Sequence, residues 1–320
     1  MKTKYSLGVF FCMIATLSWG GSFPIMTSAL KHIDPFNFTA MRYSIAGVAF
    51  LIILLFREGP QALNLKGERI GLAWFLGTAG FAGFGFLVFL GQKLAGPTGA
   101  LTASIVMATM PMLGLLVGWV VKGAKPPMLT LAFILLSFTG VILVITNGNV
   151  SALLSRPQSF SAYVPLLLGA LCWVVYTIGA SYFPAWSPYR YTTITTLLGL
   201  TSIFAIDVIL MMAGYISLPA VPDVVTVIPH LLYMSLVAGL IGVLSWNMGN
   251  KIITPLNGVL FMDIVPVTAF TVSALTGVIP SEMRIFGACI TGIALIFNNL
   301  YQRQRMMRMT MTSKTSTQPG

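Results

Sequence analysis

Residues 36–56 read FNFTAMRYSIAGVAFLIILLF and contain one charged side chain, Arg42. A helix of about 20 apolar residues crosses a hydrocarbon layer about 30 Å thick, and this stretch has that length and character. Similar runs follow along the 320 residues, with only short polar gaps between them. The sequence therefore predicts a protein that crosses a membrane many times.

The composition of the whole chain supports this prediction. Hydrophobic residues make up 57% and charged residues 8%, and the mean hydropathy is +0.90. A soluble domain carries about a quarter charged residues, so this composition excludes a soluble globular enzyme.

Windows of about 19 residues place ten spans, five in each half of the chain. Backbone polar groups in lipid must be hydrogen-bonded within the protein, and runs of this length favour helices over the alternating strands of a barrel. The predicted fold class is therefore all-α, an integral membrane protein with ten transmembrane helices. The expected spans are Leu7–Leu30, Phe36–Phe56, Ile70–Leu90, Gly99–Val121, Met128–Thr146, Tyr163–Tyr182, Thr192–Ala213, Val225–Met248, Leu256–Val278 and Ile285–Tyr301.

Lysine and arginine predict the orientation of these spans. Of 18 such residues, thirteen fall in segments on the side of the N-terminus, four fall on the opposite side, and Arg42 lies within a span. Cytoplasmic loops carry an excess of these residues, so both termini are expected in the cytoplasm. The first apolar run is expected to be a span and not a cleaved signal peptide, because no polar mature domain follows it.

The remaining charge and ligand chemistry is sparse. The net charge is +11, but the basic residues lie singly in short gaps, so no nucleic-acid partner is expected. Cys12, Cys172 and Cys289 lie within apolar runs and are expected to pack there. His32 and His230 alone cannot build a metal centre, and no Walker sequence appears. The sequence predicts no metal, no cofactor and no enzyme activity.

The two halves repeat the same features in the same order. Residues 17–21 read LSWGG and residues 171–175 read LCWVV, while 138–143 read FTGVIL and 290–295 read ITGIAL. Five spans per half is an odd number, so the second half enters the membrane from the opposite side. This predicts an inverted repeat, as in many transporters that alternate access, with halves at 1–147 and 148–302 and a disordered basic tail at 303–320.

At this point the chain resembles the ten-helix EamA family of the drug/metabolite transporter superfamily over residues 5–302. The residues that carry the resemblance form an ordered set. They are Trp19-Gly20-Gly21-Ser22-Phe23, Arg42, Pro111, Pro266, Glu282, Gly140 and Gly292. One departure is Lys122-Gly123-Ala124-Lys125, where the family usually has a glutamate after span four.

The resemblance implies export or exchange of a small organic molecule, such as an amino acid, a metabolite or a drug, across the bacterial inner membrane. It also implies alternating access, with proton antiport as the commonly proposed energy source. The expected partners are the substrate, the lipid bilayer and protons. The oligomeric state does not follow from the sequence.

Two aspartates within spans are candidates for ion coupling. Asp263 lies about 10 Å along span nine by helical rise, three residues before Pro266, which is expected to open the helix there, as Pro111 is in span four. Asp207 lies deep in span seven without a local partner. An ionisable group in a membrane marks a functional site by default, and the alternative is a structural carboxylate bonded to a neighbouring helix.

Arg42 has two interpretations. Its guanidinium can hold a carboxylate through two parallel hydrogen bonds. It can equally act as a structural staple, and the resemblance favours the staple because the family has arginine here irrespective of substrate. Asp263 and Arg42 together would suit a zwitterion.

Several aromatic and amide side chains are expected to line a central substrate pathway, because aromatic faces provide apolar contact and a polar handle. Trp19 and Trp173 occupy matched positions of the repeat and are the preferred pair. Packing between helices is the alternative role for the whole set. The candidates are Trp19, Phe23, Tyr43, Trp173, Tyr176, Trp246 and Asn247.

Two rival functions remain open from sequence alone. A channel would need a selectivity ring, and the spans show no charged ring or carbonyl filter motif. A receptor or assembly subunit would normally show a region outside the membrane for its partner, and here that region is the tail. A secondary carrier is the leading prediction.

Overall fold

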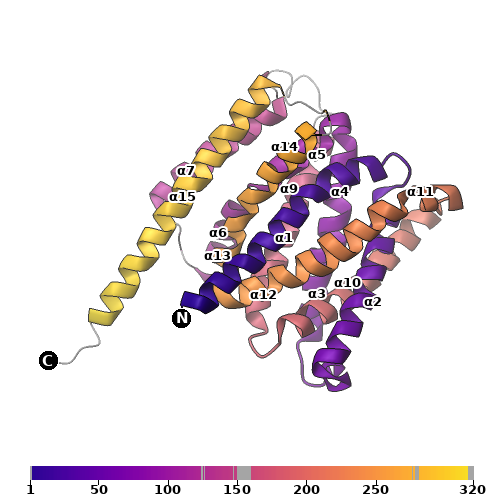
Figure 1. Ribbon diagram of the computed structural model, residues 1–320, viewed down its shortest axis with the longest axis horizontal. Helices are drawn as coiled ribbons and strands as arrows, with labels where there is room; N and C mark the ends of the chain where they lie inside the picture. Colours follow the sequence, from indigo (N-terminus) through magenta and orange to yellow (C-terminus); the bar gives the residue numbers. More distant parts are fainter. Residues whose placement is uncertain are drawn as a thin grey trace.

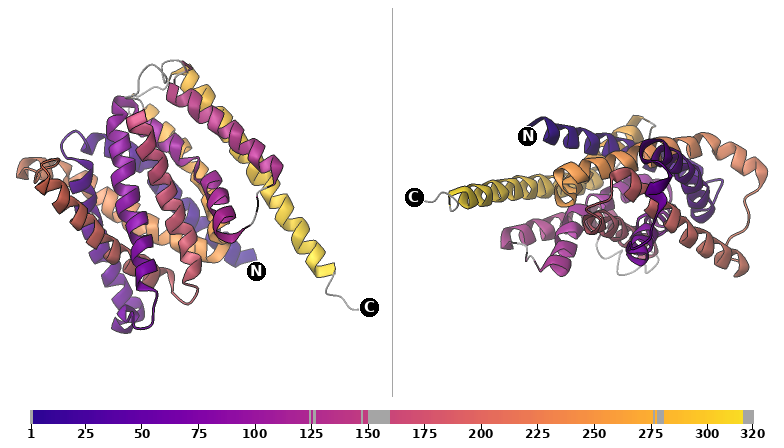
Figure 2. Two further views of the ribbon diagram at one scale, coloured as in Figure 1. Left: turned by 180° about the vertical axis from the view of Figure 1, so that it is seen from behind. Right: turned by 90° about the horizontal axis from the view of Figure 1, so that it is seen from below.

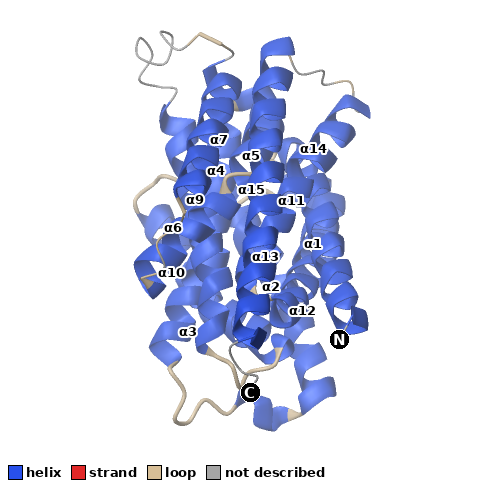
Figure 3. Ribbon diagram, turned by 90° about the vertical axis from the view of Figure 1, so that its left-hand side faces the viewer, coloured by secondary structure: helices blue, strands red, loops and turns tan. Residues whose placement is uncertain are grey.

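The computed structural model describes residues 2–123, 125, 127–146, 148–149, 160–275, 277 and 281–315. Within these residues the chain is helical and contains no strand, as Figure 3 shows. This confirms the all-α prediction for the described part. Asn147, at the expected boundary between the halves, and the 150–159 segment lie outside it.

The helices follow one another with short connections (Figure 1). They are α1 (Lys2–Ala29), α2 (Pro35–Glu58), η1 (Pro60–Leu63), α3 (Ile70–Gly77), η2 (Thr78–Gly83), α4 (Phe84–Leu94), η3 (Gly96–Thr98), α5 (Gly99–Met107), α6 (Met110–Lys122), α7 (Met128–Thr146), α9 (Phe160–Gly179), η5 (Ala180–Tyr182), α10 (Pro188–Met212), α11 (Val221–Leu232), η6 (Tyr233–Val243), α12 (Leu244–Ile253), α13 (Pro255–Gly258), η7 (Val259–Asp263), α14 (Ile264–Leu275) and α15 (Glu282–Thr315).

Seven helical stretches of the described residues are long and apolar enough to cross a membrane. The ten-span count therefore stays a prediction for the α7, α14 and α15 regions. The seven stretches are Lys4–Ala29, Pro35–Glu58, Ile70–Leu94, Gly99–Val121, Ser161–Tyr182, Pro188–Met212 and Val221–Ile253.

Several helices begin earlier than the apolar windows indicate. Helix α10 begins at Pro188, where Thr192 was expected, because Ser187 caps it by accepting a hydrogen bond from the Arg190 amide. A proline at the first helical position needs no amide hydrogen. Hydropathy windows detect apolar residues and miss such polar first turns.

The last helix is also longer than expected. Helix α15 continues to Thr315, so the segment after residue 303 is helical where disorder was expected. Extending an existing helix avoids the cost of nucleation, and methionine, arginine and lysine are good helix formers.

Two spans are interrupted near their prolines. A turn at 108–109 separates α5 from α6, and the 3₁₀ segment η7 precedes α14. Pro111 lies in the first turn of α6 and Pro266 is the third residue of α14. Both prolines therefore follow the break, at positions where a missing amide hydrogen leaves no helical bond unmade.

Two other stretches contain wide helical turns. The segments η2, between α3 and α4, and η6, between α11 and α12, are both π-helical. Short π-helical insertions occur frequently at functional sites. Here they place irregular backbone in the middle of two long apolar helices.

Helices α7 and α15 lie side by side, at the edge of the bundle (Figures 1 and 2). Gly140 on α7 permits their close approach, since a Cβ there would lie 2.4 Å from the Thr291 hydroxyl and 2.6 Å from the Gly287 carbonyl. Its sequence counterpart Gly292 meets nothing within 4 Å. The matched glycines therefore do not play equivalent roles.

The main buried core lies among α1, α2, α4, α5, α9, α10 and α12, away from the α7 and α15 pair. We call the two ends of the helix bundle the Arg190 end and the His32 end. The Arg190 end contains the end of α2, the start of α10 and the end of α12, and the His32 end contains the end of α1 and the start of α11.

Candidate functional site

The structure brings the expected aromatic side chains together in the core. The Trp19 ring meets the Trp173 ring edge to face at 5.2 Å between centroids and the Trp246 ring at 5.1 Å. Trp173 lies 5.1 Å from the Tyr176 ring. Residues from α1, α9 and α12 thus form one aromatic cluster.

A small cavity adjoins this cluster. Five predicted residues line it, namely Trp19, Phe23, Arg42, Tyr43 and Trp173. The centre of a water molecule can reach about 30 Å³ of it, and one water needs about 10–15 Å³. In this conformation the cavity therefore holds about two water molecules, and an organic solute requires the helices to move apart.

Sequence reasoning missed seven other lining residues, and six of them are apolar. Phe84 and Phe89 come from α4, Met107 from the end of α5, and Met262 from η7. Apolar residues of this kind carry no local signal that separates a cavity wall from lipid-facing packing. Only the helix arrangement assigns them to the site.

Three donors around the cavity have partners within the protein. Trp19 donates from Nε1 to the Ala238 carbonyl at 2.9 Å, and Arg42 donates from Nε to the Met234 carbonyl at 2.9 Å. Both carbonyls belong to the π-helical segment η6. Trp246 donates from Nε1 to the Thr177 hydroxyl at 3.0 Å.

Three other polar groups lack partners. They are Nη1 of Arg42, the hydroxyl of Tyr43 and Nε1 of Trp173. The side chains of these residues are 3%, 0% and 3% exposed. Buried polar groups are normally hydrogen-bonded, so this concentration around one cavity is unusual.

The Arg42 guanidinium lies among aromatic rings. Its carbon is 4.7 Å from the centroid of Tyr43 and 5.5 Å from that of Phe89. Among the described side chains no carboxylate pairs with it, and the ion pair found there joins Arg190 to Glu68. Arg42 is thus held by the Met234 carbonyl and by the rings of Tyr43 and Phe89. Its Nη1 has no hydrogen-bond partner.

A group of hydrogen-bonded residues around Asn247, which we call the floor, adjoins the aromatic cluster through Tyr176. Asn247 donates from Nδ2 to the Tyr176 and Thr192 hydroxyls, at 2.8 Å each. The Tyr191 hydroxyl donates to the Tyr176 carbonyl at 2.7 Å. Asn247 therefore joins three helices, in a predicted pathway position but with its amide hydrogens already used.

A second cavity opens toward the Arg190 end. It has a volume of about 280 Å³, and Trp186, Tyr191, Asn247, Asn250 and Lys251 lie on its walls. Asn247 therefore belongs both to the floor and to the walls of this cavity. Its partner Tyr176 contacts Trp173, which lines the central cavity.

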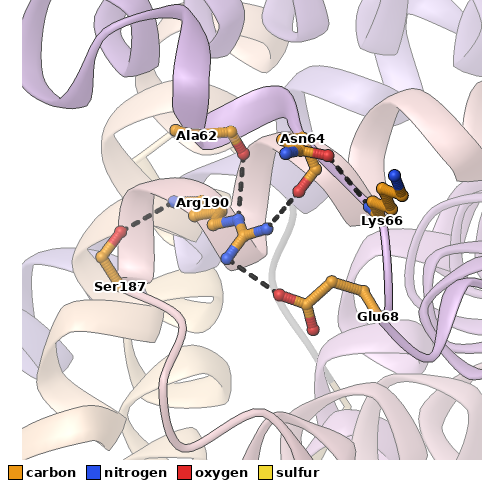
Figure 4. Close-up of polar contacts among 6 residues, drawn as sticks. All are labelled: Ala62, Asn64, Lys66, Glu68, Ser187 and Arg190. Carbon is orange, nitrogen blue, oxygen red and sulfur yellow. Dashed lines mark hydrogen bonds and ion pairs between the residues drawn. The ribbon is translucent and has the colours of Figure 1, made fainter.

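A clasp formed by Arg190 closes part of this end (Figure 4). Arg190 pairs with Glu68 at 3.1 Å and donates to the carbonyls of Ala62 at 2.9 Å and Asn64 at 2.7 Å. Its guanidinium also lies 4.6 Å from the Trp186 ring. The planar fork of arginine suits several acceptors at once, so one side chain fixes the 62–68 segment against the start of α10.

The predicted coupling residues lie outside this set of contacts. Asp207 on α10 is 4% exposed, its Oδ1 has no partner, and it does not line the central cavity. The side chain of Asp263 lies outside the described part, although its neighbour Met262 lines the cavity. Pro266 faces an apolar groove beside α15. No group of three or more potential metal ligands occurs among the described residues.

Comparison with known proteins identifies the family. The model of the EamA-like transporter family matches residues 6–146 and again 160–300. The Bacillus subtilis (strain 168) protein named "Uncharacterized transporter YrdR" is 37% identical over 303 residues, covering 95% of this chain and 94% of that protein. "Uncharacterized transporter YyaM" of the same organism is 25% identical over 278 residues, covering 87% and 88% of the two chains.

A solved crystal structure is similar in fold. It matches with a TM-score of 0.65 at 20% identity and covers 92% of this chain and 96% of its own. Two adjacent family matches also agree with the doubled order of motifs along the sequence. The chain belongs to the EamA-like transporter family, a group of integral membrane proteins.

Proposed function

We propose that the protein is a secondary active transporter that exports or exchanges a small organic metabolite, such as an amino acid or an amphipathic drug, by alternating access. The observation that carries the proposal is the small central cavity lined by matched tryptophans of the two halves, Trp19 and Trp173. A site between two half-structures is what alternating access requires.

The proposal includes a topology. Ten spans form two inverted repeats, and the protein lies in a bacterial inner membrane with both termini in the cytoplasm. The excess of lysine and arginine on one side supports this orientation. The Arg190 end is then cytoplasmic, and the second cavity is the vestibule through which a cytoplasmic substrate reaches the floor at Asn247.

Counterflow in reconstituted vesicles tests the proposal. Vesicles are loaded with one unlabelled compound from the amino acids, nucleosides and organic cations, and diluted into the same labelled compound. A carrier accumulates label transiently and saturates with concentration. The Trp173→Ala variant is expected to lose up to about tenfold in apparent affinity, because an aromatic contact contributes about 0.5–1.5 kcal/mol beyond the area it buries.

Trp119→Ala is the matched control, because Trp119 is exposed on α6 and lies outside the cavity. Flux without counterflow or saturation for every compound would indicate a channel. Wild-type affinity in the Trp173→Ala variant would place the substrate elsewhere.

A further inference from the structure

The unpartnered polar groups around the central cavity are all able to donate hydrogen bonds. Nη1 of Arg42 and Nε1 of Trp173 are pure hydrogen-bond donors, and the Tyr43 hydroxyl is able to donate. All three line the same cavity. By contrast, the donors of Trp19 and Trp246 are bonded to protein acceptors, so the shortage is confined to the groups around this space.

The positive charge of Arg42 indicates which kind of hydrogen-bond partner is missing. Guanidinium is always protonated and carries no acceptor. Its contacts with a carbonyl and two rings leave its positive charge without an anion among the described residues. A buried charge is stable when it is paired and fully hydrogen-bonded, so the missing partner is an acceptor with negative charge.

We propose that this cavity binds the carboxylate of an organic anion, held by Arg42, Tyr43 and Trp173. This inference rests on the proposed transport function and names its substrate class. An ionised carboxylate only accepts hydrogen bonds and has about four lone-pair directions, which matches three converging donors. The apolar side chains of Phe84, Phe89 and Met107 suit the hydrocarbon body of such a molecule better than they suit a strongly hydrated inorganic anion.

The same geometry links binding to helix movement. Arg42 and Trp19 are both held by carbonyls of η6. A carboxylate that draws the guanidinium toward itself therefore pulls on the π-helical segment, and the cavity must widen to admit the solute. Ligand binding and the opening of η6 against α1 and α2 are expected to occur together.

The test compares carboxylates with amides of the same shape. Benzoate with benzamide, and phenylacetate with phenylacetamide, are titrated into the purified full-length protein by calorimetry. We expect each carboxylate to bind at least about tenfold more tightly than its amide, since hydrogen bonds to a charged group are about twice as strong as those between neutral groups. Arg42→Gln should remove this preference, because a neutral amide has no charge to pair with the carboxylate.

Three further variants complete the design. Arg57→Gln, on the same helix but outside the cavity, should keep the preference. Tyr43→Phe and Trp173→Phe keep an aromatic ring and remove one donor each, so each should weaken carboxylate binding about threefold to tenfold. They keep the inference testable if Arg42→Gln does not fold.

Four outcomes would overturn the inference. In the first three, no carboxylate binds better than its amide, inorganic phosphate binds in preference to both carboxylates, or carboxylate affinity is unchanged in both Tyr43→Phe and Trp173→Phe. Asp263→Asn identifies an internal partner, because a carboxylate affinity raised tenfold in that variant would make Asp263 the counter-ion of Arg42 and overturn the inference. Counterflow of another compound class would still support transport.

Discussion

A change of solvent access can change the protonation of Asp207 and Asp263, but not that of Arg42. A carboxylate takes up or releases a proton as its surroundings change from buried to wet, while guanidinium stays charged. We therefore divide the roles at the level of single residues. In the proposed transporter, Arg42 is expected to hold the anionic end of the substrate, and an aspartate within a span is expected to supply the proton coupling.

Asp263→Asn is expected to abolish accumulation driven by an imposed pH gradient and to leave exchange of labelled for unlabelled substrate partly intact. The amide keeps the shape of the side chain but cannot carry a proton. Both processes are measured in the same reconstituted vesicles. Asp223→Asn, in the first turn of α11, serves as the control.

Accumulation at the wild-type level in the Asp263→Asn variant would make Asp263 structural. Asp207→Asn would then be the next variant to measure, because Asp207 is buried and its Oδ1 has no partner. Accumulation in the wild type that ignores the pH gradient would reject proton coupling for this protein.

At the level of the elements, η6 is the backbone that shapes the cavity. Its carbonyls at 234 and 238 accept from Arg42 and Trp19, and its Tyr233 hydroxyl donates to the Ser18 carbonyl at 2.9 Å. Each carbonyl oxygen has two lone pairs and so accepts a side chain beside its helical partner. The position of η6 therefore sets the positions of two cavity residues.

Gly242→Ala is expected to displace Trp19 and weaken ligand binding. A Cβ at Gly242 would lie 2.7 Å from Nε1 of Trp19 and 2.8 Å from the Ser18 hydroxyl. Such overpacking destabilises a core by about 1–3 kcal/mol. Thermal unfolding and the titration of phenylacetate measure the two effects.

Gly114→Ala on α6 is the matched control, since its Cβ would meet only the Val259 side chain at 3.6 Å. Alanine there should be neutral or stabilise the helix by up to about 1 kcal/mol. Equal melting temperatures and affinities in the two variants would show that η6 does not set the position of Trp19.

At the level of the whole molecule, Arg190 connects the two halves. It lies on α10 in the second half and binds three acceptors between residues 62 and 68 of the first half. If the Arg190 end faces the cytoplasm, these contacts must break whenever the two halves move apart at this end. The clasp is thus expected to bias the protein toward the closed conformation.

Arg190→Gln is expected to speed amide hydrogen exchange in residues 59–69 by up to about fivefold, because a partly buried surface ion pair contributes up to about 1 kcal/mol. Exchange is followed by mass spectrometry on the detergent-solubilised protein. Residues 214–220, at the His32 end, should keep their wild-type rates.

Lys66→Gln removes a cation from the same segment, but its side chain makes none of the contacts of the clasp (Figure 4). It should leave exchange unchanged. If Lys66→Gln speeds exchange as much as Arg190→Gln does, the effect comes from the loss of positive charge and not from the clasp.

The sequence by itself determined the helical class, the doubled order of motifs and the residues of the aromatic cluster. Apolar runs of about 20 residues indicate membrane-spanning helices from local sequence alone. Matched positions in the two halves, such as Trp19 and Trp173, indicate the repeat. The same local signals placed the helix ends several residues wrongly, as at Pro188 and Thr315, because caps and helix extension do not depend on hydropathy.

Only the tertiary structure decided which polar groups are free to bind. Trp19 and Trp173 are equivalent in sequence, yet the Trp19 indole reaches a carbonyl 219 residues away and the Trp173 indole reaches none. Likewise Gly140 meets a neighbouring helix and Gly292 meets open space. The physical reason is that a hydrogen bond or a close contact depends on what lies across the helix interface, and the local sequence fixes only one side of that interface.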